Sequence, residues 1–270
     1  MKLEKFKPSI SPQMDKLIKE NLDDIAGDHG VKILFAVESG SRAWGFPSPD
    51  SDYDVRFVYA HPADWYLSIF PGRDVIEIPI DEVLDINGWD IQKALGLLLK
   101  PNPVMLEWLS SPIRYVWDDA ICDTLIEFSH QVAHRNACLH HYLHLAESQW
   151  AKHVGDNAEV NFKKYFYILR PALAIRWIRL HPDVSPPMNL QAMVEGLDLA
   201  ANTVGEIARL LELKSKAKEI GSGSRIAEID ALIAEETDWA RATDKSKQRS
   251  DLIGAADDLF RQIVSEVGNA

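Results

Sequence analysis

The stretch that decides the fold runs from Gly40 to Asp54 and reads GSRAWGFPSPDSDYD. A short apolar run rich in β-branched residues precedes it, Val31 to Val37, and is typical of a buried strand. A second run with strand character follows it, from Tyr53 to Tyr59. Glycine in a turn between two strands lets the backbone approach a ligand closely. This turn is therefore the best candidate for a binding site in the chain.

Two acidic side chains stand at the end of this stretch. Asp52 and Asp54 are two residues apart, so a strand places both on one face. Two such carboxylates repel each other unless a cation lies between them. Mg²⁺ fits, because proteins usually hold it with one or two carboxylates together with substrate phosphates. The pattern is also common on solvated turns, but its position after Gly40-Ser41 and an apolar strand favours a metal site.

The beginning of the stretch suits a phosphate group. Gly40 allows close approach of the backbone, and Ser41 offers both a hydroxyl and a backbone N–H. A helix that starts near Arg42 would direct the positive end of its dipole to the same phosphate. We therefore expect Gly40, Ser41 and Arg42 to contact a phosphorylated ligand.

The rest of the chain predicts a mixed sheet followed by helices. Ser11-Pro12 has the form of a helix start, a capping residue followed by proline. The helix that starts there is expected to end at Asp28-His29-Gly30. Two short strands at 75–80 and 83–87, or one bent strand, are expected next, followed by a helix at 89–100. Further helices are expected near 119–150, 158–180, 189–213, 224–242 and 246–267, with a polar loop at 214–224. The expected class is α+β: a mixed β-sheet with flanking helices in residues 1–115, followed by a helical domain in residues 116–270.

Composition excludes several classes of protein. The net charge of -12 argues against a broad surface that follows nucleic-acid phosphates. No apolar stretch approaches the roughly 20 residues of a membrane span, and the first residues lack the apolar core of a signal peptide. Cys122 and Cys138 are too few for a disulfide framework. We expect a cytoplasmic protein without a membrane partner.

The order of strand, Gly-Ser and Asp-x-Asp resembles the nucleotidyltransferase superfamily that includes DNA polymerase β. The match extends beyond the turn, through GSRAWG at 40–45, SDYDVR at 51–56, LDINGWDIQKAL at 84–95 and KKYFYILRP at 163–171. This longer pattern is similar to the nucleotidyltransferases of the YcgL-like family, which is related to the RNA-repair-associated RlaP type. The resemblance implies a nucleotidyltransferase-fold sheet and transfer of a nucleoside monophosphate from a nucleoside triphosphate to an acceptor hydroxyl on RNA, a protein or a small molecule.

The resemblance also implies Mg²⁺ or Mn²⁺ held by Asp52, Asp54 and a third acid. Asp85 is our choice for the third acid, because it stands on a short predicted strand directly before a helix. Glu77, on the preceding predicted strand, is a competitor. Asp90 is a weaker one, because at the first turn of a helix it would serve as a cap.

A helix in the second half could complete a nucleotide site. Lys163, Tyr167 and Arg170 follow i, i+4 and i+7 spacing, so they share one helix face. A lysine, a tyrosine and an arginine on one face can hold a triphosphate and stack a base. The alternative interpretation is a solvated basic edge. With the family resemblance, we expect these three residues to bind nucleotide.

Two other functions compete with an active transferase. One is a non-catalytic nucleotide-binding regulatory module, against which the intact Gly-Ser and Asp-x-Asp residues argue. The other is a HEPN-like ribonuclease, because Arg135 and His140 match its short R-x₄-H motif. That motif is short enough to arise by chance.

Overall fold

The computed structural model describes residues 3–70, 72–80, 83–100, 102–132, 134–216, 221–243 and 251–268. They form two units that interleave along the chain. The sheet unit comprises Pro8–Gly40, Asp52–Ala133 and Arg249–Ala270, and the helical unit comprises Met1–Lys7, Ser41–Ser51 and His134–Gln248. The sequence placed one boundary near residue 115, whereas the structure assigns the segment 41–51 to the helical unit and the C-terminal segment to the sheet unit.

Helix α1, Pro12–His29, opens the sheet unit as the sequence predicts. The Ser11 hydroxyl accepts a hydrogen bond from the backbone N–H of Met14, and Pro12 occupies the first turn, where no N–H partner is needed. Gly30 ends the helix in the left-handed conformation, with φ of 60°. The helix buries Ile18, Leu22 and Ile25.

The sheet has five strands in the order β3-β4-β2-β1-β5. The strands are β1 Lys32–Ser39, β2 Tyr53–Ala60, β3 Val75–Glu77, β4 Leu84–Asp90 and β5 Arg114–Trp117. β2 and β4 are parallel and the other pairs are antiparallel, so the sheet is mixed, and the expected α+β class is confirmed.

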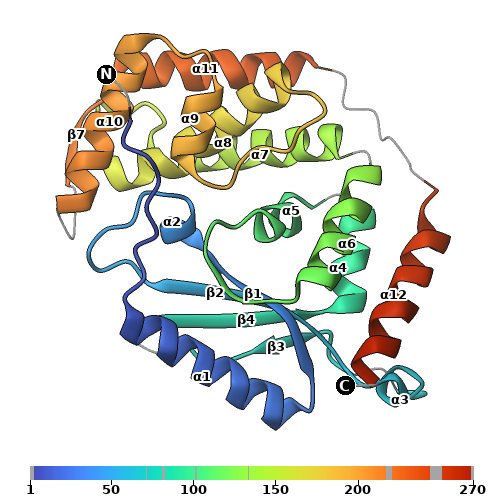
Figure 1. Cartoon of the computed structure of the whole chain (residues 1–270). Helices are drawn as coiled ribbons and strands as arrows, with labels where there is room; N and C mark the ends of the chain where they lie inside the picture. The colour runs from blue at the N-terminus through green and yellow to red at the C-terminus, as the bar shows by residue number, and fades with distance from the viewer. Residues whose placement is uncertain are drawn as a thin grey trace. The chain divides into compact units, whose positions relative to one another are not determined.

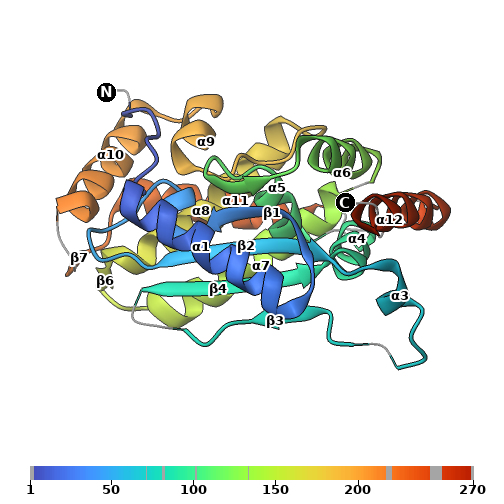
Figure 2. The ribbon, with the colours of Figure 1, turned by 60° about the horizontal axis from the view of Figure 1, so that its bottom comes forward.

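Helices cover the sheet on both sides. Figures 1 and 2 show α1 on one side and α4, α5 and α6 on the other. These helices span Ile91–Leu99, Pro103–Leu109 and Asp119–Gln131. The short α3, Ala63–Tyr66, and the last helix α12, Ile253–Gly268, also belong to this unit, and α12 packs on α3, α4 and β2.

The helical unit is built around α8, Phe162–Leu180, which packs between α7, Arg135–His153, and α11, Ala227–Ala242. α9 Leu190–Gly196 and α10 Ala201–Lys216 complete it, together with a small ribbon of β6 Glu159–Asn161 and β7 Ser222–Ser224. No helix among the described residues is long and apolar enough to cross a membrane.

Some predicted helices are shorter than expected. The helix expected at 119–150 is two helices, α6 and α7, and the one at 189–213 is divided into α9 and α10. α9 ends at Gly196, where a Cβ would lie 2.4 Å from the Trp177 ring, so the chain needs glycine at this packing contact. The expected loop at 214–224 is partly structured, because Lys214 belongs to α10 and β7 pairs with β6, while residues 217–220 lie outside the described part. The last helix begins at Ile253, and the expected start at 246 also lies outside it.

Candidate active site

Gly40 and Asp54 meet at the end of the β1–β2 pair. Ser39 and Asp54 are register partners, so Gly40 leaves the sheet beside Asp54. Gly40 has a φ of 62°, and a Cβ on it would lie only 1.9 Å from Asp54 Oδ2. Both the left-handed backbone and this close approach require glycine. Gly40 therefore lies directly against one of the two predicted acids.

Asp85 lies beside Asp54 on the neighbouring strand. The parallel register of β2 and β4 pairs Asp54 with Asp85 and Arg56 with Asn87. Arg56 Nη2 is 2.6 Å from Asp85 Oδ2 and 3.5 Å from Asp54 Oδ1. Asn87 Nδ2 donates to Asp85 Oδ1 at 2.5 Å. Two carboxylates therefore share a guanidinium on one face of the sheet.

Asp52 lies just before β2 and is exposed to solvent. Among the residues that the structure describes, no group of three His, Cys, Asp or Glu side chains is arranged as a metal site. The donor set nevertheless fits a hard cation, because carboxylate oxygens are its preferred ligands and the Arg56 guanidinium already lies as a positive charge between two of them. Asp52 and Asp54 would hold such a cation, with Asp85 within reach by register.

The two competitors of Asp85 have other partners. Glu77 lies on the edge strand β3 and pairs with Arg73 at 2.6 Å, with both side chains exposed. Asp90 caps α4 by accepting the N–H of Gln92 at 2.7 Å, the role that its position predicted. It also accepts the hydroxyl of Tyr66, and burial raises the pKa of this carboxyl.

Glu38 contacts the backbone of the candidate site, although the sequence analysis did not single it out. Its side chain is fully buried, and Oε1 accepts the backbone N–H of Asp54 at 2.9 Å. Oε2 accepts the hydroxyl of Tyr115 on β5. Its position in the sequence could have indicated a structural role, because a glutamate at the end of an otherwise apolar strand is buried only where it has a partner. Glu38 positions the backbone that carries Asp54.

The segment 41–51 packs within the helical unit. Arg42 is buried, and its Nη2 donates to the carbonyl of Ser51 at 2.5 Å, which closes the loop on itself. The Phe46 ring stacks on Phe166 of α8 with centroids 4.8 Å apart. The backbone N–H of Leu190 donates to the carbonyl of Trp44 at 2.9 Å. The phosphate-binding loop predicted from sequence is thus held by aromatic packing.

The predicted helix face takes part in this packing. Tyr167 meets the Trp44 ring edge-on at 6.0 Å between centroids. Arg170 is buried, donates to the carbonyl of Met188 at 3.2 Å and lies over the Trp44 ring at 4.8 Å. Lys163 is exposed. In this structure Tyr167 and Arg170 support the loop, and their nucleotide contacts remain predictions.

Lys214 of α10 lies under the same loop. Its side chain is 1% exposed, and its ammonium lies 4.4 Å from the centroid of Phe46 and 5.4 Å from that of Phe166. Among the described residues Nζ has no hydrogen-bond partner. Burial, with a smaller contribution from the nearby charge of Lys163, lowers the pKa of Lys214 to about 7.

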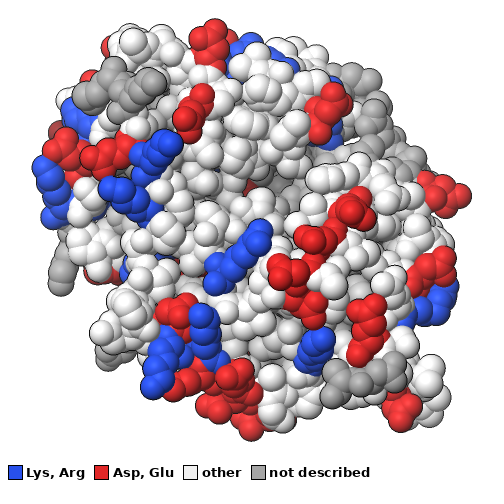
Figure 3. Space-filling view, viewed as in Figure 1, with Lys and Arg blue, Asp and Glu red and all other residues white. Residues whose placement is uncertain are grey.

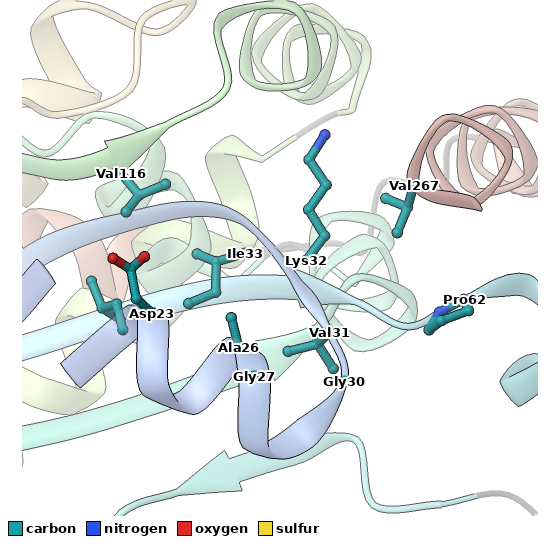
Figure 4. A pocket seen from close by; sticks show the side chains of 11 residues that line it. Asp23, Ala26, Gly27, Gly30, Val31, Lys32, Ile33, Pro62, Val116 and Val267 are labelled. Atoms are coloured by element: carbon teal, nitrogen blue, oxygen red, sulfur yellow. The ribbon is translucent and has the colours of Figure 1, made fainter. Parts of the chain in front are cut away.

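One pocket of the sheet unit lies apart from the predicted site residues. This pocket lies between α1 and the start of β1, lined by apolar side chains with Asp23 and Lys32, and none of the predicted site residues lines it (Figure 4). On the face shown in Figure 3, acidic and basic side chains lie together in several places, and a row of acidic side chains lies right of the centre. Arg135 begins α7 and His140 is exposed five residues later, which is about 140° around a helix and so not on one face.

Comparisons with known proteins agree with the motif. The family model described as RlaP, the RNA repair pathway DNA polymerase beta family, matches residues 14–262. Uncharacterized protein YcgL of Bacillus subtilis (strain 168) is 40% identical over 258 residues, which are 94% of this chain and 98% of that protein. A nucleotidyltransferase-like protein from Exiguobacterium sibiricum 255-15 matches in structure over 92% of this chain and 80% of its own, with 10% identity and a TM-score of 0.31.

Proposed function

Because this chain belongs to the RlaP family, the RNA repair pathway DNA polymerase beta family, we propose that it is a metal-dependent nucleotidyltransferase that moves a nucleoside monophosphate from a nucleoside triphosphate to an acceptor hydroxyl and releases pyrophosphate. The family supports nucleotidyltransferase-type activity in general. The observation that carries the finer proposal is the contact of Gly40 with Asp54, beside Asp85 in parallel register.

Each residue has a separate task in this proposal. Asp52 and Asp54 would hold Mg²⁺ or Mn²⁺, with Asp85 as the third acid once Arg56 moves aside. When bound, the metal would supply Lewis-acid polarisation of a phosphoryl oxygen and neutralise developing charge. Ser41, directly after Gly40, would donate its hydroxyl and backbone N–H to the triphosphate. The third acid would help to deprotonate the acceptor hydroxyl.

RNA is the acceptor that we propose. The family description names an RNA repair pathway, and the 3′ end of a broken RNA offers the hydroxyl that the reaction needs. A protein with a net charge of -12 is unsuited to coating RNA, so recognition would be confined to an RNA end.

The test is transfer of label from each of the four nucleoside triphosphates to total RNA or extract protein, with Mg²⁺ or Mn²⁺. We expect labelled RNA with the wild type and none with the Asp52→Asn/Asp54→Asn double variant. Metal-dependent nucleotide binding without label transfer to any acceptor would instead support the regulatory module. Equal labelling by the double variant would reject the proposed site.

A further inference from the structure

Arg56 is held between two carboxylates by contacts that do not depend on them. Its Nη1 donates to the backbone carbonyls of Val55 at 2.9 Å and Asp85 at 2.7 Å. Its Nη2 reaches Asp85 Oδ2 at 2.6 Å and Asp54 Oδ1 at 3.5 Å. The backbone therefore places the guanidinium so that its second nitrogen faces both acids.

The two acids need a positive charge where they lie. Asp54 and Asp85 are register partners on adjacent strands, with side chains only 30% and 22% exposed, so water screens their repulsion incompletely. Arg56, 18% exposed, supplies that charge. The Asn87 amide donates a hydrogen bond to the other oxygen of Asp85, which orients this carboxylate without adding a charge.

A divalent cation and this guanidinium would compete for the same pair of acids. Arg56 contacts one oxygen of each carboxylate and leaves further lone pairs, but a cation bound to both acids would lie close to the guanidinium, and two positive groups at such a distance repel each other. We propose that Arg56 is an internal cation that holds Asp54 and Asp85 together until a divalent cation displaces it, so that Arg56 sets the metal affinity of the site. The inference rests on the proposed function, because the metal is the one that would accompany the nucleotide.

The sheet unit offers a matched comparison in Arg73. This arginine also contacts a carboxylate at 2.6 Å, that of Glu77, but both side chains are largely exposed. Arg73→Met removes the same charge as Arg56→Met without touching the acid pair. Exposed ion pairs contribute little, so Arg73→Met should leave metal binding unchanged.

The experiment measures Mn²⁺ binding without nucleotide, by calorimetry and by electron paramagnetic resonance. Arg56→Met should bind Mn²⁺ about tenfold more tightly than wild type, the effect of removing a competing charge-assisted hydrogen bond. The Mn²⁺ affinity of Arg56→Lys should lie between those of wild type and Arg56→Met, because a lysine ammonium keeps the charge but cannot make both sets of contacts. Adding Asp54→Asn to Arg56→Met should abolish the gain. In chelator, Arg56→Met should melt below wild type, and Mn²⁺ should raise its melting temperature more than it raises that of wild type.

Equal or weaker Mn²⁺ affinity in Arg56→Met overturns the inference, as does an equal gain in Arg73→Met. If Arg56→Met does not fold, Arg56→Lys decides, and affinity at or below the wild-type value overturns the inference. If Arg56→Met binds Mn²⁺ more tightly but the wild type transfers no label to any acceptor, the proposed function is rejected and the inference stands. If the wild type transfers label but Arg56→Met has unchanged Mn²⁺ affinity, the inference is rejected and the proposed function stands.

Discussion

Gly40 combines a left-handed backbone with a neighbour too close for any Cβ. The first property is shared with Gly30, which has a φ of 60° but no atom within 4 Å of its missing Cβ. The close neighbour is found only at Gly40, where it is a carboxylate oxygen of Asp54. Substituting each glycine in turn therefore distinguishes the effect of backbone strain from the effect of displacing Asp54.

Gly40→Ala should lower stability and abolish label transfer, because the methyl group must displace the Asp54 carboxylate. Gly30→Ala is the control. It should cost a similar 1–2 kcal/mol or so of backbone strain, about what a left-handed residue costs, while leaving transfer intact. Thermal melting of both variants measures the loss of stability, and label transfer by both variants measures the effect on the site. Equal activity of the two variants would show that Asp54 tolerates displacement.

Glu38→Gln should misplace Asp54 through its backbone. Glutamine keeps one acceptor for the Asp54 N–H and can donate its NH2 group to the Tyr115 hydroxyl, so both contacts become neutral hydrogen bonds, each about 1 kcal/mol weaker than a bond to a charged group. Tyr115→Phe removes only the second bond. We expect metal-dependent nucleotide affinity, measured by calorimetry, to fall in Glu38→Gln and to stay near wild type in Tyr115→Phe. The same loss in both variants would contradict a positioning role for Glu38.

At the scale of elements, the segment 41–51 shows what the sequence could and could not predict. The residues that flank it, Gly40 and Asp52, could be predicted as site residues because their residue types and spacing are local properties. Its middle was not, because the packing of Phe46 on Phe166 joins residues 120 positions apart. Helical spacing correctly placed Lys163, Tyr167 and Arg170 on one helix, but periodicity does not reveal whether a face meets a ligand or another part of the chain.

Lys214→Met should stabilise the helical unit, and the gain should depend on pH. The folded pKa of Lys214 is lowered to about 7 from 10.5, so below pH 7 folding buries an ammonium. Between these values the unfolded chain binds one more proton than the folded chain, so wild-type stability rises with pH. The gain from methionine should therefore be largest below pH 7, on the order of 5 kcal/mol as an upper estimate at about 1.4 kcal/mol for each pKa unit, and should vanish near pH 10.5. Urea denaturation at pH 6 and pH 9 measures it, and a gain that does not change with pH would contradict the burial argument.

At the scale of the whole molecule, the interleaving of the units was beyond sequence reasoning. The apolar stripe of α12 predicts a buried helix face, but a stripe carries no information on which surface covers it. In the structure it belongs to the sheet unit, where it packs on α3, α4 and β2, and Phe260 meets Tyr66 edge-on at 4.9 Å. Tyr66 in turn donates to Asp90, the cap of α4. The division at residue 115 was drawn from the change to helical patterning, and that change does not mark where contacts end.

Deletion of residues 251–270 should therefore destabilise the sheet, although the sheet strands end at Trp117. The deletion uncovers the surface that now buries the apolar side chains Leu259, Ile263 and Val264. At 1.5–3 kcal/mol for each buried apolar side chain, the loss is about 4.5–9 kcal/mol as an upper estimate, and on the order of 5 kcal/mol once the compactness of the unfolded chain is counted. Hydrogen exchange of backbone amides measures where the loss falls. We expect faster exchange in β2 and α4 and unchanged exchange in α8 and α11, because a destabilised unit opens without its neighbour. Faster exchange in α8 and α11 with β2 and α4 unchanged would show that α12 supports the helical unit instead.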